Sequence, residues 1–336
     1  MQIFLRLLAT ALVVIIIDVT GGASRGAETQ AGTQATTTQP TTLPTWKRQQ
    51  DVIYGRTAGT ALTFDVFTPT AEKPNGAAVI IVVSGGWLSS HEVLDSPMIS
   101  VFIGPFIRHG YTVFGVVPAS QPKFTINEIA ENVDKSVKFI RANAERFKID
   151  GGKIAITGGS AGGHLSLLQA TKPSPGKKLS LDALERASGR VQAAAVLFPP
   201  TDFLNYRAEG KNIMDDPMLD PFAAAFDFHE MDNTQHKLVP VSRRRHTEIL
   251  RELSPAQNIS KNTPPCLIIH GDKDELVPIQ QATIFLDKLK AQGVTAELIV
   301  KKGAAHGWGN AEVEIEQMAQ FFDKILLGRE AGKETP

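Results

Sequence analysis

The chain has 336 residues, of which 42% are hydrophobic, which is enough for one large hydrophobic core. The 35 Lys and Arg residues balance 35 Asp and Glu residues, so the composition lacks the basic excess typical of nucleic-acid-binding proteins, and no nucleic-acid partner is expected. The single cysteine, Cys266, excludes an intrachain disulfide. Because Cys266 lies in an apolar run, we interpret it as a buried structural thiol.

The first 23 residues have the pattern of a secretory signal peptide. Arg6 precedes an apolar run over residues 7–17, and small residues follow at 21–23. The run is shorter than the roughly 20 residues that span a bilayer, so cleavage is favoured, with an uncleaved membrane anchor as the alternative. Residues 24–45 are rich in Thr, Gln and Pro and are predicted to be a disordered linker. We therefore expect an exported protein, periplasmic or secreted, that contacts a membrane only if the N-terminal segment is retained.

Strands and helices alternate over residues 46–330, which we predict to be one α/β domain. The expected strands are 61–67, 77–83, 112–117, 154–157, 193–198, 266–270 and 297–300, and the expected helices are 97–109, 126–147, 162–170, 280–292 and 311–327. This alternation predicts a mainly parallel central sheet with helices on both faces. Residues 206–262 contain no clear strand and are too long for an ordinary loop, so we predict a cap or lid insertion there.

The strand expected at 154–157 runs directly into Gly158-Gly159-Ser160-Ala161-Gly162. A serine hydroxyl acts as a nucleophile only with a base to take its proton and donors to hold the resulting oxyanion. Glycines permit the sharp strand-to-helix turn that would present Ser160 at the sheet edge. The pentapeptide alone is a weak signal, since Gly-x-Ser-x-Gly arises by chance in roughly one chain in ten of this length. The flanking strand and helix make Ser160 a credible nucleophile.

A second motif, residues 270–278, follows the strand expected at 266–270. A carboxylate placed there can reach a histidine across the edge of the sheet, and Asp274 is our candidate for that role. Asp272 is interpreted as a turn residue that bonds its own backbone. His270 is interpreted as a strand-end residue rather than a metal ligand, because no further ligand cluster is evident nearby, and no metal is expected.

The third motif, residues 303–308, follows the strand expected at 297–300 and contains His306, the candidate general base. A histidine in a loop of small residues can lie between a serine and a carboxylate. The chain order Ser160, Asp274, His306 is that of the α/β-hydrolase triads and differs from the order in other common serine triads. His164 is close to Ser160 in sequence, but the helical pattern places it on the helix after the serine, where we expect it to pack.

The early strand at 77–83 ends in Ser84-Gly85-Gly86-Trp87. Backbone N–H groups of Gly85 and Gly86 are predicted to pair with that of Ala161, the residue after the nucleophile, to form the oxyanion hole.

Together these motifs resemble the α/β-hydrolases of the esterase and lipase kind, nearest the small feruloyl- and acetylxylan-esterase-like branch. The resemblance covers about residues 60–327. It departs from the family's His-Gly-Gly-Gly-Trp at the oxyanion strand, where this chain has Val83 and Ser84 in the first two positions. Gly85 and Gly86 are kept, so the backbone donors survive, and the Trp87 N–H is an alternative donor if the loop is rotated.

The resemblance and the motifs predict a serine hydrolase that cleaves small or carbohydrate carboxylic esters through an acyl-enzyme, without a metal or organic cofactor. A peptidase of the prolyl-oligopeptidase kind is the first alternative, although the residues before Thr60 are too few for the upstream propeller of such enzymes. The motifs also leave open a catalytically silent hydrolase fold used for binding, and an acyltransferase.

Overall fold

The computed structural model describes residues 45–329. The predicted signal peptide and all of the predicted linker except residue 45 therefore lie outside the described residues and stay predictions. Within residues 45–329, no helix is both long and apolar enough to cross a membrane.

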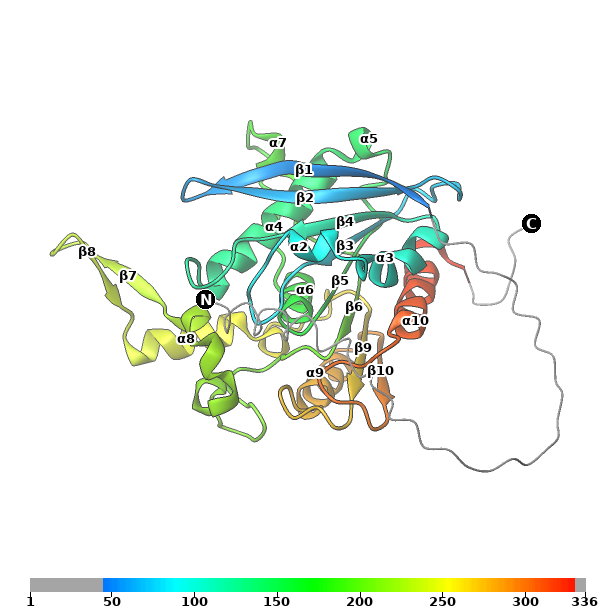
Figure 1. Ribbon diagram of the computed structural model, residues 1–336. Helices are drawn as coiled ribbons and strands as arrows, with labels where there is room; N and C mark the ends of the chain where they lie inside the picture. Colours follow the sequence, from blue (N-terminus) through cyan, green and yellow to red (C-terminus); the bar gives the residue numbers. More distant parts are fainter. Residues whose placement is uncertain (1–44, 330–336) are drawn as a thin grey trace, which may run out of the picture.

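One eight-stranded sheet forms the centre of the described domain (Figure 1). Its strands lie in the order β1-β2-β4-β3-β5-β6-β9-β10. Their bounds are Trp46–Thr57 for β1, Thr60–Pro69 for β2, Ala78–Val82 for β3, Thr112–Val117 for β4, Ile154–Gly159 for β5, Ala193–Leu197 for β6, Cys266–Gly271 for β9 and Ala296–Lys301 for β10. The two pairs that contain β2 are antiparallel, and the strands from β4 to β10 are parallel to one another. The predicted mainly parallel sheet is confirmed, with β1 as an additional strand.

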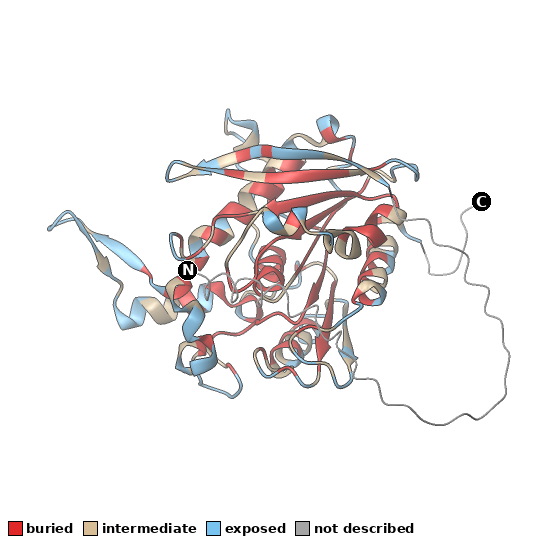
Figure 2. Ribbon diagram, in the orientation of Figure 1, coloured by how far each residue is buried: buried red, intermediate tan, exposed pale blue. Residues whose placement is uncertain are grey.

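Helices cover both faces of this sheet, and the central strands between them are buried (Figure 2). The larger core packs α4 (Ile126–Ala142), α6 (Ala161–Thr171), α8 (Arg243–Leu253) and α9 (Gln280–Ala291) against one face. The other core packs α3 (Ile99–Arg108) and α10 (Glu312–Phe322) against the opposite face. Successive side chains of a strand point to opposite faces of the sheet, so one strand contributes to both cores. In β3, Ile80 and Val82 belong to the first core and Ile81 belongs to the second.

The remaining helical segments are short. They are α2 (Glu92–Asp95), α5 (Ala144–Phe147), α7 (Ala183–Arg186) and the π-helical turn η4 (Asp323–Leu327) that follows α10. The helix expected over 126–147 is thus α4 and α5, interrupted at Asn143. The buried apolar residues of α4 repeat every three or four positions, which is why the sequence pattern predicts this helix.

The predicted insertion, residues 206–262, does contain strands, so the expectation of none is wrong. It comprises η1 (Ile213–Asp215), η2 (Pro217–Phe226), β7 (His229–Asp232), β8 (Lys237–Pro240), α8 and η3 (Pro255–Gln257). β7 and β8 form an antiparallel hairpin that projects away from the body of the domain (Figure 1). Because the hairpin is exposed on both faces, its sequence lacks the apolar alternation that marks a half-buried strand. The first part of the insertion packs beside the loop that follows β3, because the rings of Phe222 and Phe226 in η2 contact Trp87.

Candidate active site

Ser160 stands in the turn between β5 and α6 with φ 52° and ψ −120°, a backbone conformation that a non-glycine residue rarely adopts. The turn is held by two backbone bonds, Ser160 N–H to the Leu197 carbonyl and Gly162 N–H to the Ser84 carbonyl, both 2.9 Å. A Cβ on Gly162 would lie 2.4 Å from the Val82 carbonyl oxygen. The glycine is therefore required by the close approach of α6 to β3, and the sharp turn presents the serine hydroxyl.

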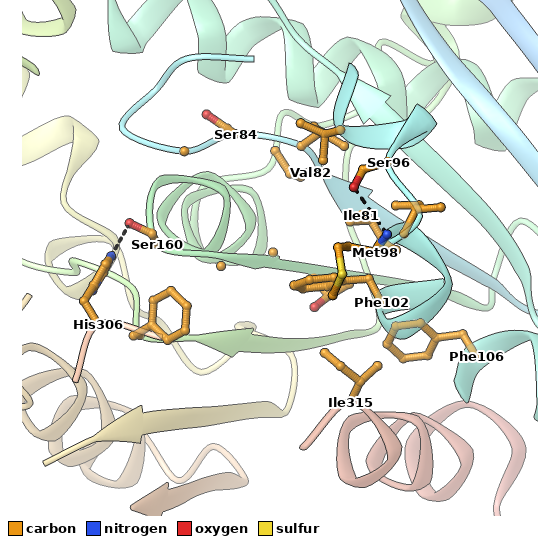
Figure 3. Close-up of a pocket in the computed structure, with 18 residues that line it drawn as sticks. Ile81, Val82, Ser84, Ser96, Met98, Phe102, Phe106, Ser160, His306 and Ile315 are labelled. Carbon is orange, nitrogen blue, oxygen red and sulfur yellow. Dashed lines mark hydrogen bonds between the residues drawn. The ribbon is translucent and has the colours of Figure 1, made fainter. Parts of the chain in front are cut away.

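The three predicted triad residues meet at the carboxyl edge of the parallel sheet. His306 Nε2 lies 2.9 Å from Ser160 Oγ (Figure 3), and His306 Nδ1 lies 2.7 Å from Asp274 Oδ2. β5 positions the serine, the loop after β9 positions the carboxylate, and the loop after β10 positions the histidine. This continuous chain of hydrogen bonds joins a nucleophile, a base and an orienting carboxylate.

Asp274 is buried and receives more hydrogen bonds than the one from His306. Its Oδ1 accepts the N–H groups of Leu276 at 3.0 Å and Val277 at 2.8 Å, and His270 Nε2 lies 3.3 Å from Oδ2. Burial alone would raise the pKa of Asp274, but hydrogen bonds from His270 and His306 and the backbone N–H bond lower it below its ordinary value. The carboxylate is thus kept ionised, and His270, at the end of β9, contributes to that environment in a way that sequence reasoning missed.

The loop after β3 requires one correction to the predicted oxyanion hole. The Gly85 N–H donates to the Leu88 carbonyl at 2.9 Å, so it is not directed at a substrate. Gly86 and Ala161 both line a small cavity with Ser160 and His306, and Ala161 begins α6, where the N–H has no intrahelical acceptor. Gly86 and Trp87 have positive φ angles of 56° and 59°, so the loop has the rotated conformation considered above. In that conformation the Trp87 N–H is an additional candidate donor. Gly85 is therefore removed from the predicted set, and Gly86 and Ala161 stay as candidate donors.

Comparison with protein families agrees with this geometry. The BD-FAE family model matches residues 64–289, more than half of the chain. The chain belongs to the BD-FAE family. The matched span contains Ser160 and Asp274 but ends before His306, so the assignment of this histidine rests on its sequence motif and on its position in the structure.

Two curated relatives of this BD-FAE protein are ester hydrolases by name. The probable carboxylic ester hydrolase LipM of Mycobacterium tuberculosis is 27% identical over 84% of this chain and 63% of its own length. Esterase LipC of the same organism is 27% identical over 76% of this chain and 59% of its own length. The chain thus spans about three fifths of the length of these relatives.

Solved structures show the fold. A truncated carbohydrate esterase from gut microbiota has a TM-score of 0.68 at 23% identity, covering 85% of this chain and 98% of that one. An acetyl ester-xyloside bifunctional hydrolase from Caldicellulosiruptor lactoaceticus has a TM-score of 0.64 at 18% identity, covering 82% and 96%. The BD-FAE protein therefore has the predicted α/β-hydrolase fold.

The loop after β3 contains the candidate donor Gly86 and Trp87, and we call it the oxyanion loop. In the BD-FAE protein, the buried side chain of His164 holds this loop in place. Trp87 Nε1 donates to His164 Nδ1 at 3.2 Å, and His164 Nε2 lies 2.8 Å from the Leu253 carbonyl oxygen. Burial lowers the pKa of His164 to about 4, so the ring is neutral and carries its proton on Nε2. Gln121 Nε2 also donates to the Gly86 carbonyl, at 2.5 Å. The expectation that His164 packs on α6 is confirmed, but its bond to a residue 77 positions earlier has no signal in the sequence.

Two cavities lie beside Ser160, and both have Ser160 and His306 in their walls. The larger has a volume of about 140 Å³ and extends toward α3 and α10 (Figure 3). The smaller, about 20 Å³, faces the first part of the insertion through Tyr206, Leu219 and Phe222. The first part of the predicted cap therefore forms one wall beside the nucleophile.

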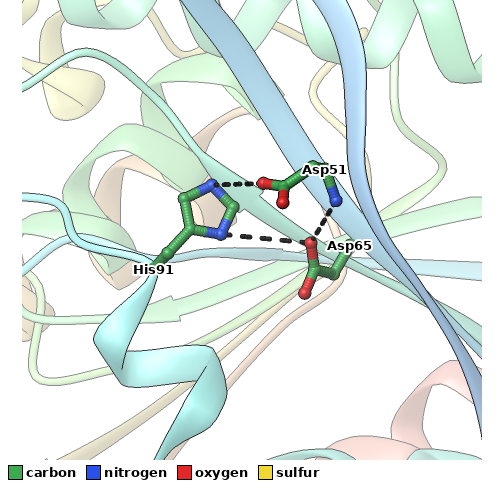
Figure 4. Close-up of side chains that lie close together, drawn as sticks. All are labelled: Asp51, Asp65 and His91. Carbon is green, nitrogen blue, oxygen red and sulfur yellow. Dashed lines mark hydrogen bonds and ion pairs between the residues drawn. The ribbon is translucent and has the colours of Figure 1, made fainter.

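A group of potential metal ligands lies apart from the triad, at Asp51, Asp65 and His91 (Figure 4). Asp65 is buried and pairs with Arg48, whose Nε donates to Asp65 Oδ2 at 2.7 Å. Asp65 Oδ1 accepts the Asp51 N–H at 2.9 Å. Because a guanidinium already neutralises the buried carboxylate, we interpret this group as a structural tie between β1 and β2, and we assign no metal to it.

Proposed function

We propose that this BD-FAE protein is a serine ester hydrolase that acts through an acyl-enzyme. The observation that carries the proposal is the Ser160–His306–Asp274 chain, with bonds of 2.9 and 2.7 Å. The ester-hydrolase names of the relatives support an ester substrate over the peptide of the prolyl-oligopeptidase alternative. We further propose small-molecule or carbohydrate esters as substrates, in line with the names of the structural neighbours.

Each residue has a defined role in the proposed reaction. Ser160 Oγ attacks the ester carbonyl carbon while His306 Nε2 takes its proton, and the ionised Asp274 stabilises the resulting imidazolium. The N–H groups of Gly86 and Ala161 stabilise the oxyanion. His306 then protonates the leaving alcohol, and a water molecule, deprotonated by the same imidazole, attacks the acyl-enzyme and releases the acid.

We also propose that the protein is exported. The pattern of residues 1–23 supports export to the periplasm or the medium. N-terminal sequencing of the mature protein from a periplasmic or culture fraction would test it, and an intact Met1 in a membrane fraction would contradict cleavage.

Removal of the nucleophile is the direct test of the proposed activity. Ser160→Ala is expected to lower kcat for p-nitrophenyl butanoate by about 10⁴-fold or more, since the oxyanion hole and binding alone retain little of the rate. The control is Ser100→Ala, the same substitution on α3 outside both cavities, which should hydrolyse the ester at the wild-type rate.

A fluorophosphonate probe separates an enzyme from a silent hydrolase fold. The wild type should be labelled once per chain and Ser160→Ala should not be labelled. An unlabelled wild type would support a binding protein instead. New esters formed when acceptor alcohols are added would indicate acyl transfer in place of hydrolysis.

A further inference from the structure

The larger cavity is a channel that begins at the catalytic serine and runs between the sheet and two helices. Its walls come from the ends of β3 and β5, from the 93–106 segment that includes α3, and from α10 through Ile315. In Figure 3, Met98 and Phe102 lie along the channel, and Phe106 lies at the end away from Ser160. A group attached to Ser160 Oγ can therefore enter the channel directly.

The channel is lined by apolar side chains along most of its length. Among the described residues that line it, His306 is the single ionisable one, and the other polar side chains are the hydroxyls of Ser84, Ser96, Thr157 and Ser160. A charged group, or a sugar with several hydroxyls, would lose more hydrogen bonds to water here than these few side chains can replace. The lining therefore selects an apolar ligand.

The volume of the channel limits the length of that ligand. The channel measures about 140 Å³, close to the roughly 150 Å³ of an apolar protein cavity that accommodates benzene, a molecule of six carbons. We propose that the channel binds the acyl group of the ester and selects unbranched apolar chains of about four to six carbons over acetyl and over long fatty chains. This inference rests on the proposed ester hydrolysis and specifies its substrate.

The acyl group, rather than the alcohol, is assigned to the channel because of the order of events. The acyl group stays covalently attached to Ser160 until water attacks, so it can occupy a narrow channel throughout the reaction. The alcohol has to depart from beside His306 before that water enters. The smaller cavity, of about 20 Å³, holds the oxyanion donors Gly86 and Ala161 and has no room for a chain.

The test is a series of p-nitrophenyl esters from acetyl to decanoyl, with the alcohol held constant. Wild-type kcat/KM is expected to rise about fourfold per methylene up to about six carbons and to fall for octanoyl and decanoyl esters. Phe106→Ala should move the optimum to longer chains by opening the far end. Met98→Phe should move it toward acetyl by narrowing the channel. A second series, with butanoyl held constant and the alcohol varied, should rank the alcohols alike in all three proteins.

Two matched controls separate channel shape from general loosening of the core. Phe321→Ala is the same truncation in the same core but does not line the channel, and Val101→Phe adds the same ring on α3 outside it. Neither control should move the optimum. If Phe106→Ala fails to fold, Met98→Phe decides the matter. This inference would be overturned if the wild type hydrolysed all chain lengths equally well, or if Met98→Phe left the optimum unmoved. Either result would leave the proposed ester hydrolysis intact. A wild type that hydrolyses no ester would overturn the proposed function itself.

Discussion

Ser160 combines backbone strain with two backbone hydrogen bonds that fix its turn. The positive φ of Ser160 is unfavourable for a residue with a side chain, by about 1–3 kcal/mol. Two backbone bonds, one to the end of β6 and one to the loop after β3, offset that strain. The strained turn holds the hydroxyl within reach of His306 before any substrate arrives, so no reorganisation is needed at the moment of attack.

The indole of Trp87 links the oxyanion loop to the core through its bond to His164. Trp87→Phe removes the N–H that donates to His164 Nδ1 and leaves this acceptor buried without a partner. We expect the free energy of unfolding to fall by about 1–3 kcal/mol. Because Trp87 follows Gly86, kcat for the butanoyl ester should fall about tenfold while KM changes little, as for a lost transition-state contact.

The matched control is Trp46→Phe, the same substitution on β1 and far along the sheet from the site. Trp46→Phe should leave kcat unchanged. If Trp87→Phe lost stability in urea unfolding but kept its kcat, Trp87 would be a core residue without influence on the oxyanion loop.

At the scale of elements, the start of α6 lies closely against the end of β3, beside Ser160. Gly162→Ala would place a Cβ 2.4 Å from the Val82 carbonyl oxygen, which is backbone and cannot rotate away. We expect α6 to shift, with a loss of about 1–3 kcal/mol in the free energy of unfolding by urea. The Ser160 hydroxyl moves with α6, so ester hydrolysis should fall by about 100-fold.

Gly309→Ala is the control for this substitution, since a Cβ there meets nothing within 4 Å. Its stability should stay within about 0.5 kcal/mol of the wild type. Equal effects of the two substitutions would show that α6 tolerates displacement from β3.

The elements that sequence analysis predicted correctly are those whose burial follows a simple period. The parallel strands are buried on both faces and appear as continuous apolar runs, and α4 repeats its buried stripe. β1 is largely exposed, and the β7–β8 hairpin is exposed on both faces, so neither carries such a pattern.

The same distinction applies to the site. Ser160, Asp274 and His306 were identifiable because each follows a predicted strand of a parallel sheet, whose carboxyl ends share one edge. The engagement of the Gly85 N–H by Leu88, and the bond from Trp87 to His164, depend on loop conformation and on contacts distant in sequence. Motif spacing does not encode either of them.

At the scale of the whole molecule, the two helices that line the larger cavity, α3 and α10, are also joined by a cluster of charged side chains. His109, which caps α3, lies 2.6 Å from Glu316 Oε1 through Nε2 and 2.9 Å from Asp323 Oδ2 through Nδ1. Arg108 forms an ion pair with Glu316 as well, and the Tyr111 hydroxyl donates a hydrogen bond to Asp323 Oδ1. This cluster fastens α3 to α10 on the face of the sheet that contains the channel.

The cluster predicts a stability that decreases as pH rises. Burial alone would lower the pKa of His109, but the hydrogen bonds and charges of Asp323 and Glu316 raise it from 6.5 to about 9. Because the folded-state pKa lies above the unfolded value, the stabilisation is complete below pH 6.5 and is lost as pH rises through about 9. We expect the stabilisation from the charged His109 to be about 2 kcal/mol once solvent screening at this partly exposed site is allowed for.

In urea unfolding, the difference in the free energy of unfolding between the wild type and His109→Gln should therefore narrow by that amount between pH 6 and pH 9.5. His229→Gln, on the exposed hairpin, should show no such narrowing. A constant difference between the wild type and His109→Gln across this range would mean that His109 joins the helices as a neutral side chain.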